Sequence, residues 1–239
     1  MREGAALHPD SLQTLRGLDI EALPLVEGTP QDDLRLGPCV GRVGKFVCIG
    51  LNYSDHAAEA GMPVPPEPVI FNKWTSAICG PNDPIQVPRG STKTDWEVEL
   101  GVVIGTGGSY IDEGDAMAHV AGLCVINDVS EREFQLDRAG TWDKGKGCDT
   151  FGPVGPWLVT ADEVADPQAL GLRLWVNGVE RQNGTTANMI FGIRHIVWYL
   201  SQFMVLHPGD VVNTGTPAGV ALGIEGLGTQ KQLFKPYAG

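Results

Sequence analysis

The sequence predicts a β-rich α+β fold with one main domain. From Lys45 onward, apolar runs of four to seven residues recur between turn signals, and this spacing is typical of strands. Gly and Pro, with 32 and 17 residues, make up about a fifth of the 239-residue chain, against an average near 12%. Such an excess favours a turn-rich protein over a helical bundle. A chain of this length also buries roughly 70% of its unfolded surface, so no disulfide support is required.

The chain divides into two segments. Residues 1–44 form an approach segment, punctuated by Pro and Gly, with one short helical candidate from Pro9 to Leu18. Residues 45–239 carry the strand pattern and form the predicted folded domain. Its expected strands, in chain order, are Phe46–Leu51, Pro68–Phe71, Val98–Ile104, Gly122–Ile126, Val154–Val159, Leu172–Val176 and Asp210–Val212.

One hairpin and one long helix are well signalled. Asn177-Gly178 suits the positive φ angles of a type I′ turn and follows the strand that ends at Val176. Apolar residues recur at three- and four-residue steps from Met189 to Met204, and His207-Pro208-Gly209 provides the stop. We therefore expect a single long helix over this stretch.

Charge and cysteine usage exclude several functions. The net charge of -12 opposes binding to a phosphate backbone or an anionic membrane. Five scattered cysteines without a C-x-x-C pair suggest reduced, buried thiols. The sequence shows neither a signal peptide nor an 18-residue apolar run. We expect a cytoplasmic protein that binds neither nucleic acid nor membrane.

Three carboxylates lie on or at the end of predicted strands. Glu97 and Glu99 are two residues apart, so the period of two places them on one face, roughly 7 Å apart at their α-carbons. Asp128 ends another apolar strand, before a short helix that the capping-box pair Ser130 and Glu133 predicts. A bare pair of glutamates is more often a solvated strand face. With a third carboxylate and no partner Cys or His, the donor set favours Mg²⁺, Mn²⁺ or Ca²⁺ over zinc.

A short helix carries a candidate general base. Ser54 is its predicted N-cap and Gly61 its predicted stop. This places His56 and Glu59, three residues apart, on one helix face. A carboxylate beside an imidazole fixes its tautomer and raises its basicity, as activation of water requires. Taken alone, such a pair is most often structural.

Two lysines and a glycine-rich turn are candidates for contact with an anionic substrate. Lys73 follows an apolar strand, and Lys146 lies between Gly145 and Gly147. Cations beside carboxylates could anchor an anion and stabilise an enolate, although each lysine taken singly is more often a solvated loop residue. The turn Asn213–Gly219 could aim backbone N–H groups at a carboxylate, and it lacks the nucleotide P-loop pattern.

In their order along the chain, these motifs resemble those of the fumarylacetoacetate hydrolase family. They are G-L-N-Y-x-D-H-x-x-E, F-x-K, the E-x-E strand, N-D-x-S-x-R-x-x-Q, G-K-x-x-D-T-F-G-P and T-G-T-P-A-G. The resemblance covers about residues 45–223. Within the family, the segments Asp95–Gly101 and Gly145–Pro153 look most like the 2,4-diketo-3-deoxy-fuconate hydrolase branch, often labelled ureidoglycolate lyase by similarity.

The resemblance implies a mixed β-sandwich roll of the family's C-terminal domain type for residues 45–239, usually as a homodimer. It implies Mg²⁺ or Mn²⁺ at the three carboxylates, with Ca²⁺ as a substitute in crystals. It also implies a mobile lid in which His56 and Glu59 activate water. The positions that would face the substrate are Lys73, Arg132, Gln135, Lys146 and Thr216.

Two departures from the family pattern stand out. The small N-terminal strands of relatives are missing, and so are a loop and a strand expected just before Ile224-Glu225-Gly226. A natural deletion and a gap in the sequence would both explain this. We expect the gap, because losing a core strand would expose its neighbours.

The expected activity is a metal-dependent hydrolase that cleaves a carbon–carbon bond in a 2,4-diketo acid, either an acylpyruvate or a diketo-deoxy sugar acid. Its expected partner is a small anionic keto acid, which yields pyruvate and a carboxylic acid. The alternatives with the same metal–enolate chemistry are an oxaloacetate-type decarboxylase and a hydroxy-dienedioate isomerase. A binding module that uses the metal only for stability is a further alternative, which Lys146 and the His56/Glu59 pair disfavour.

Overall fold

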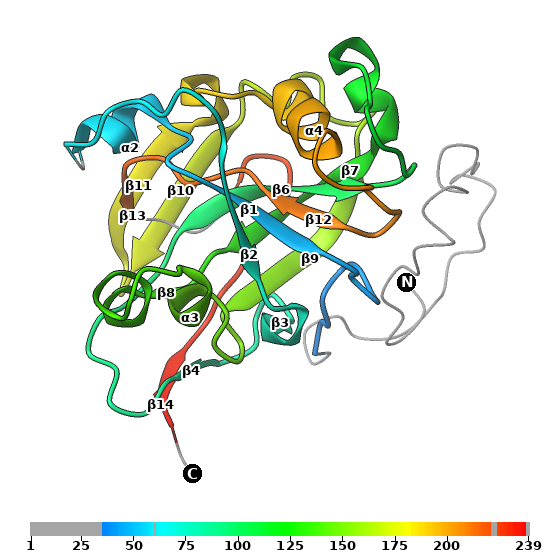
Figure 1. Ribbon diagram of the computed structural model, residues 1–239. Helices are drawn as coiled ribbons and strands as arrows, with labels where there is room; N and C mark the ends of the chain where they lie inside the picture. Colours follow the sequence, from blue (N-terminus) through cyan, green and yellow to red (C-terminus); the bar gives the residue numbers. More distant parts are fainter. Residues whose placement is uncertain (1–34, 60, 221–223, 238–239) are drawn as a thin grey trace, which may run out of the picture.

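The computed structural model describes residues 35–59, 61–220 and 224–237. Figure 1 shows a strand-rich, curled sheet with short helices at its periphery, as the sequence predicts. The main sheet has seven strands in the order β2-β1-β12-β6-β7-β9-β3. Their bounds are β1 Phe46–Gly50, β2 Val69–Lys73, β3 Ile78–Cys79, β6 Val98–Ile104, β7 Val120–Asn127, β9 Gly152–Thr160 and β12 Val211–Asn213.

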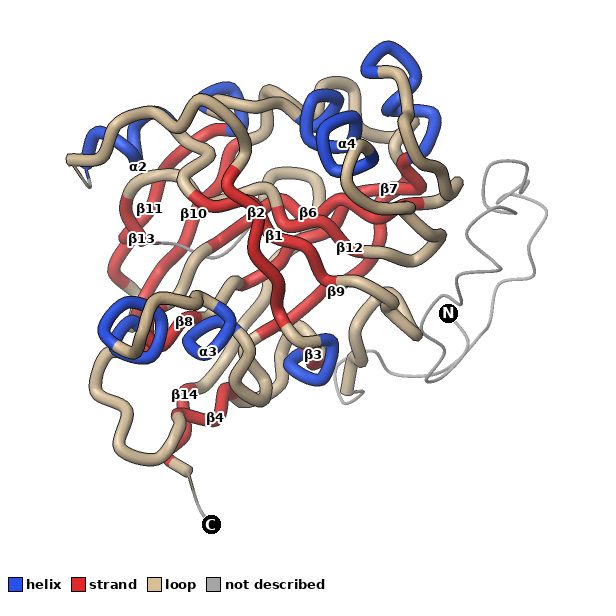
Figure 2. The backbone as a smooth tube through the Cα atoms, in the orientation of Figure 1, coloured by secondary structure: helices blue, strands red, loops and turns tan. Residues whose placement is uncertain are grey.

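Three smaller sheets surround the main one (Figure 2). Their strands are β10 Gly171–Val176, β11 Val179–Thr185 and β13 Gly219–Val220, then β4 Ile85–Val87 with β14 Phe234–Pro236, and β5 Thr94–Asp95 with β8 Ser130–Glu131. All the predicted strands are present, the one at Leu172–Val176 as β10. The predicted hairpin also forms, because Asn177 and Gly178 both have positive φ, 51° and 80°. β12, of three residues, was predicted. The other strands of two or three residues, β3, β4, β5, β8, β13 and β14, escaped prediction because they have no apolar run of their own.

The helices are short. Their bounds are α2 Ser54–Glu59, α3 Asp143–Lys146, α4 Ile193–Ser201, the 3-10 helices η4 Thr75–Ala77, η5 Glu113–His119 and η7 Thr186–Asn188, and the π-helix η6 Glu133–Asp137. The predicted helix over Met189–Met204 is too long, since α4 covers only its middle. Met189 bridges to Tyr53, and the Ile190 N–H donates to the Asn52 carbonyl at 2.7 Å. These tertiary contacts engage backbone groups of residues 189 and 190 that would otherwise form the first turn of the helix.

The predicted capping box at Ser130 is wrong. Ser130 and Glu131 form β8, which pairs with β5, and the Ser130 hydroxyl donates to the Asp128 carbonyl at 2.9 Å. The π-helix η6 begins only at Glu133, without a side-chain cap. Strand pairing across the chain therefore overrides the local helix-start pattern.

Strand β6 separates two apolar cores. Val98, Leu100 and Val102 point into the larger core, which α4 also covers, while Val103 points into a smaller core with Cys48 and Cys124. The described cysteines are free thiols, three of them buried, as expected. None of the helices in the described part of the chain is long and apolar enough to cross a membrane. The predicted helix Pro9–Leu18 lies outside the described residues.

Candidate active site

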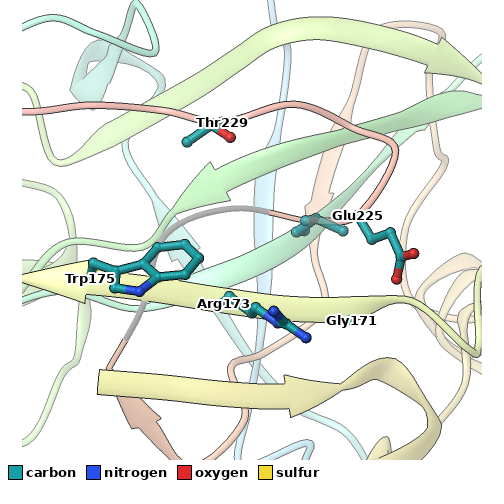
Figure 3. Close-up of a pocket in the computed structure, with 6 residues that line it drawn as sticks. Gly171, Arg173, Trp175, Glu225 and Thr229 are labelled. Carbon is teal, nitrogen blue, oxygen red and sulfur yellow. The ribbon is translucent and has the colours of Figure 1, made fainter. Parts of the chain in front are cut away.

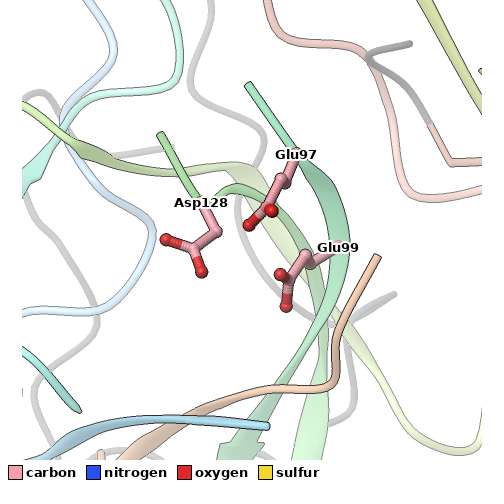
Figure 4. Close-up of side chains that lie close together, drawn as sticks. All are labelled: Glu97, Glu99 and Asp128. Carbon is pink, nitrogen blue, oxygen red and sulfur yellow. The ribbon is translucent and has the colours of Figure 1, made fainter. Parts of the chain in front are cut away.

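The three predicted carboxylates converge on one buried cluster. One carboxylate oxygen from each of Glu97, Glu99 and Asp128 lies within 4.8 Å of the other two, and all three residues are buried (Figure 4). Glu97 precedes β6 and Glu99 lies inside it, so the strand's period of two puts both on one face. The antiparallel register of β6 and β7 brings in Asp128, whose N–H donates to the Glu97 carbonyl at 2.8 Å.

Three cations surround this acidic cluster. Lys146 contacts Glu97 Oε2 and lies 2.8 Å from Asp128 Oδ2. Lys73 Nζ lies 2.5 Å from Asp128 Oδ1 on the opposite side. Arg132 Nη2 lies 2.6 Å from Glu97 Oε1 and 2.8 Å from Asp95 Oδ2. Two of the three carboxylates are therefore neutralised by the protein itself.

The surrounding charges shift the pKa values inside the cluster. Burial favours the protonated form of Glu97, but Arg132 and Lys146 outweigh it and lower the pKa of Glu97 to about 2. Burial also opposes the charge on Lys146, yet Asp128 and Glu97 raise its pKa above that of an ordinary lysine. Both groups are consequently charged near neutral pH.

Glu99 differs from its two neighbours. Among the residues that the structure describes, no lysine or arginine forms an ion pair with it, and its Oε2 accepts the Gly215 N–H at 2.6 Å. Burial raises the pKa of Glu99 well above its usual value, and the charges of Asp128 and Glu97 raise it further. A divalent cation would relieve this repulsion. Three carboxylate oxygens are also the donors that Mg²⁺ and Mn²⁺ prefer, so the cluster fits such an ion.

The glycine-rich turn after β12 serves this same carboxylate. Gly215 has φ +92°, a conformation that L side chains rarely adopt, and a Cβ there would lie 2.9 Å from Asn52 Cβ. Thr214 fixes the turn through its hydroxyl, which donates to the Leu100 carbonyl at 2.8 Å. The backbone N–H that the sequence pattern suggested for an incoming carboxylate therefore binds Glu99.

Lys146 ends the short helix α3 and is buried with 2% of its surface exposed. Its Nζ also lies 5.1 Å from the centroid of the Phe71 ring. The flanking glycines permit close packing of this helix, because a Cβ on Gly145 would lie 2.4 Å from the Glu131 carbonyl oxygen. They bring α3 against neighbouring backbone, which places Lys146 between Glu97 and Asp128.

Lys73 has a different surrounding from the predicted one. Its side chain is fully buried, with Nζ 2.5 Å from Asp128 Oδ1 and 3.0 Å from the Val129 carbonyl. It is not among the residues that line the cavity beside the cluster. Lys73 therefore holds Asp128 in place, and its contact with a substrate stays a prediction.

A cavity of about 240 Å³ opens onto the acidic cluster. Its polar lining residues are His56, Glu97, Glu99, Arg132, Gln135, Lys146 and Thr216. The structure thus brings the predicted substrate positions other than Lys73 to one cavity. Gln135 accepts a hydrogen bond from Arg132 at 3.0 Å, and Thr216 accepts one from Gln182 at 3.1 Å.

The His56/Glu59 pair lies at the edge of this cavity on α2. His56 Nδ1 is 3.7 Å from Glu59 Oε2, which is an ion-pair distance and longer than a hydrogen bond. The imidazole lines the cavity, whereas Glu59 does not and is 59% exposed. Gly61 ends this helix with φ +63°, and its N–H donates to the Ala58 carbonyl at 3.2 Å, as its predicted role as a stop requires.

Sequence reasoning missed three residues of this site. Asp95 accepts hydrogen bonds from Arg132 at 2.8 and 3.0 Å and so fixes its guanidinium. Phe71 and Trp142 line the cavity and pack edge to face at 5.2 Å. Asp95 had a local signal, since it precedes the E-x-E pair by two residues and shares its strand period. Phe71 belongs to the F-x-K motif, but nothing in the sequence signalled that it meets Trp142, because the two residues are far apart.

Another hollow lies on the three-stranded sheet β10-β11-β13, away from the acidic cluster. It has a volume of about 370 Å³ and is lined by β10 and by residues 224–229 (Figure 3). Arg173, Trp175 and Glu225 face it. It contains none of the predicted site residues and no group of three converging carboxylates. Its larger volume therefore does not make it the better candidate active site.

Known proteins resemble this chain over most of its length. The family model for the fumarylacetoacetate (FAA) hydrolase C-terminal domain matches residues 45–236. A Burkholderia multivorans protein named "Putative hydrolase" is 60% identical over 97% of this chain and 87% of its own. The crystal structure of a "putative HpcE protein" from Mycobacterium smegmatis has a TM-score of 0.86 at 37% identity, covering 95% of this chain and 88% of that one. That of 2-hydroxyhepta-2,4-diene-1,7-dioate isomerase from Mycobacterium marinum has a TM-score of 0.74 at 39% identity, covering 82% and 76%.

Proposed function

The chain belongs to the fumarylacetoacetate hydrolase family, and from this premise we propose that it is a divalent-metal-dependent hydrolase of a 2,4-diketo acid. It would cleave the carbon–carbon bond between the two carbonyl-bearing halves and release pyruvate and a carboxylic acid. One observation carries the proposal. The buried carboxylates Glu97, Glu99 and Asp128 meet Lys146 and Arg132 at a cavity that His56 also lines.

The residues suit the binding of a 2-oxo acid. A Mg²⁺ or Mn²⁺ ion held by Glu97, Glu99 and Asp128 would supply Lewis-acid stabilisation of the negative charge that develops on the 2-oxo oxygen. Arg132 and Gln135 lie beside these ligands and face the cavity. They would orient the substrate carboxylate there, since a guanidinium is a fixed, planar donor for such a group.

The remaining residues suit the proton and charge movements of hydrolysis. His56 would take a proton from water, whose hydroxyl oxygen then bonds to the distal carbonyl carbon, while the Glu59 carboxylate stabilises the imidazolium. The bond between C3 and C4 breaks, and its electron pair leaves as the enolate of pyruvate, which takes up a proton at C3. Lys146 is charged and buried, so its ammonium would stabilise that enolate strongly.

A direct test measures pyruvate release from a panel of acylpyruvates, oxaloacetate and a 2,4-diketo-3-deoxy sugar acid. We expect release from at least one diketo acid with Mg²⁺ or Mn²⁺, loss of release in EDTA, and recovery when the ion is returned. Release that persists unchanged in EDTA would exclude the metal-dependent mechanism. Release from oxaloacetate alone would favour the decarboxylase.

A hydroxy-dienedioate isomerase is the second candidate function. The observation in its favour is the likeness to the Mycobacterium marinum protein that bears this name. Isomerisation needs proton transfer but no attack by water. The His56/Glu59 pair could serve either reaction, so it favours hydrolysis only weakly. Conversion of a hydroxy-dienedioate without any cleavage of diketo acids would establish this alternative.

A further inference from the structure

The cavity beside the acidic cluster has a second, apolar side. Besides the polar residues given above, Phe71, Trp142, Met62, Leu136, Ile49 and Leu51 line it. Trp142 packs so closely over the main chain that a Cβ on Gly50 would lie 2.5 Å from its ring. Met62 and Leu136 are 47% and 60% exposed, which places uncovered apolar side chains at the mouth. A ligand whose 2-oxo acid end sits at the carboxylates would direct its other end toward these residues.

Two oxygens of this lining, those of Thr216 and Gln135, already accept hydrogen bonds from the protein. Thr216 bonds to Gln182 and Gln135 bonds to Arg132, at 3.1 and 3.0 Å. A sugar-acid tail would bring several hydroxyls into the cavity, and each buried hydroxyl without a partner weakens binding. Of the described lining residues, the apolar group offers mainly hydrocarbon and aromatic surface to such hydroxyls, with the Trp142 indole N–H as its side-chain donor.

A second carboxylate on the ligand would fare no better. The permanent cations among the described lining residues are Arg132 and Lys146. Both are held at the acidic cluster, Arg132 by Asp95 and Glu97 and Lys146 by Glu97 and Asp128. A terminal carboxylate would therefore meet Leu136, Met62 or Trp142 without a counter-charge, and no contact there would offset the part of its hydration that it loses on binding.

Because the charged residues lie at one side of the cavity and the apolar residues at the other, we propose that the substrate is an acylpyruvate with an uncharged, apolar acyl group. This inference rests on the proposed function and narrows its substrate class. It excludes as substrates the diketo-deoxy sugar acids that the motif resemblance suggested. It also excludes dioates of the kind that appears in the name of the Mycobacterium marinum isomerase. The cavity of about 240 Å³ is below the roughly 300–1,000 Å³ of drug-sized sites, which suits a short alkyl or single aromatic group.

The first test compares three substrates with the full chain in Mg²⁺. They are 2,4-dioxoheptanoate, its terminal-carboxylate counterpart 2,4-dioxoheptanedioate, and a 2,4-diketo-3-deoxy sugar acid. We expect kcat/KM for pyruvate release to favour the first by roughly tenfold or more, the discrimination that a mismatched side group commonly produces. A preference for either polar substrate would overturn the inference.

A binding test separates this inference from the proposed hydrolysis. Calorimetric Kd values for 2-oxopentanoate, 2-oxohexanoate and 2-oxoheptanoate need no cleavage. We expect affinity to rise roughly fourfold per added methylene, the ordinary gain for burial of this group. If no diketo acid is cleaved, the proposed function fails, yet a rising series would still support the apolar wall. Affinities that do not change with chain length would overturn it, whatever the enzyme cleaves.

Leu136 offers a site to reverse the preference. In Leu136→Arg, the added guanidinium at the cavity mouth should shift the kcat/KM ratio toward 2,4-dioxoheptanedioate by roughly tenfold. Leu233→Arg is the matched control, because Leu233 is similarly exposed, at 65%, and does not line the cavity. Leu136→Ser should lower activity toward 2,4-dioxoheptanoate in particular. If Leu136→Arg folds with an unchanged ratio, Leu136 does not face the acyl group and the inference is wrong.

Discussion

The two faces of β6 differ in how their side chains are held, although the side chains alternate between the faces along one short strand. One face presents Val98, Leu100 and Val102 to an aliphatic core in which each side chain touches several interchangeable neighbours. The other face begins with Glu99, and Glu97 lies just before the strand on the same side; the partners of both are individual groups at fixed distances, while Val103 farther along packs in the smaller core. A single step along the strand thus passes from non-directional packing to a cluster in which each partner is specific.

This difference separates stability from activity. When apolar atoms are removed from a packed core, the free energy of unfolding falls with the number of atoms removed, while the rest of the fold can keep its geometry. On the charged face, Glu97 is balanced by cations whereas Glu99 is crowded by like charges. Substitutions on the two faces should therefore affect different measurements, and even the two glutamates should differ.

The largest effect on activity is expected from Glu99→Gln. It removes a metal donor, so pyruvate release should fall to the level seen in EDTA. Since the change also removes a buried charge repelled by Asp128 and Glu97, the free energy of unfolding in EDTA should not fall.

Glu97→Gln is the matched comparison on the same face. It should also lose activity, but it breaks charge-assisted bonds to Arg132 and Lys146, which should lower the free energy of unfolding by about 1.5–3 kcal/mol. Denaturant titrations of both variants in EDTA measure this. Equal destabilisation by the two substitutions would contradict the distinction between the glutamates.

Lys146→Met should come next in effect. Loss of a charge that stabilises the departing enolate should lower kcat by roughly 10²–10³ with a much smaller rise in KM. Its ammonium also lies between Glu97 and Asp128, so the variant should bind Mg²⁺ more tightly in a calorimetric titration.

Lys144→Met is the control for this prediction. Lys144 lies in the same helix α3 but is exposed, and its Nζ donates a hydrogen bond to the Arg138 carbonyl, away from the acidic cluster. It should keep wild-type kinetics and metal affinity. If Lys146→Met raises KM and leaves kcat unchanged, Lys146 anchors the substrate and does not stabilise the enolate.

Glu59→Gln should have a smaller effect, a fall in hydrolysis of roughly 10², the scale of a general-base contribution. Because the metal donors are untouched, exchange of the pyruvate methyl hydrogens in D₂O, followed by NMR, should continue at the wild-type rate. Undiminished hydrolysis would remove the pair from the mechanism, and lost exchange would show that the acidic cluster had been disturbed.

The smallest effect on turnover is expected on the apolar face. Leu100→Ala should lower the free energy of unfolding by about 2–5 kcal/mol because it leaves a cavity in a packed core, while kcat stays unchanged at a temperature where the variant is folded. Denaturant titration and steady-state kinetics measure the two quantities. A large loss of kcat would show that the two faces are coupled.

Local patterns predicted the parts of the site that depend on one strand at a time. The period of two placed Glu97 and Glu99 together, and the end of an apolar run placed Asp128 at a strand terminus. Lys73 shows the limit of such reasoning. It also ends an apolar strand, yet its ammonium is buried against Asp128 and does not line the cavity, and the sequence does not record which side of a neighbouring strand a terminal side chain reaches.

The failed capping box at Ser130 has a related cause. Ser130 and Glu131 pair with residues 94 and 95, more than 30 positions earlier, and the sequence near Ser130 contains no sign of that partner. The apolar wall of the cavity was equally hidden, because Phe71 and Trp142 meet only after the sheet and α3 have packed. Contacts between distant segments were therefore the part that local patterns could not supply.

The position of β12 has a consequence for how the protein is made. β12 pairs with β1 on one side and β6 on the other, and Phe46 lies opposite Val211. On the ribosome, the antiparallel pair β1–β2 and the β6–β7–β9 group emerge as two sheets with open edges, and pairing across so long a chain separation is slow. The Gly215 N–H that holds Glu99 is synthesised later still. A nascent chain that stalls before Val211 therefore exposes two edges to wrong partners and lacks the backbone N–H that holds Glu99 in the acidic cluster.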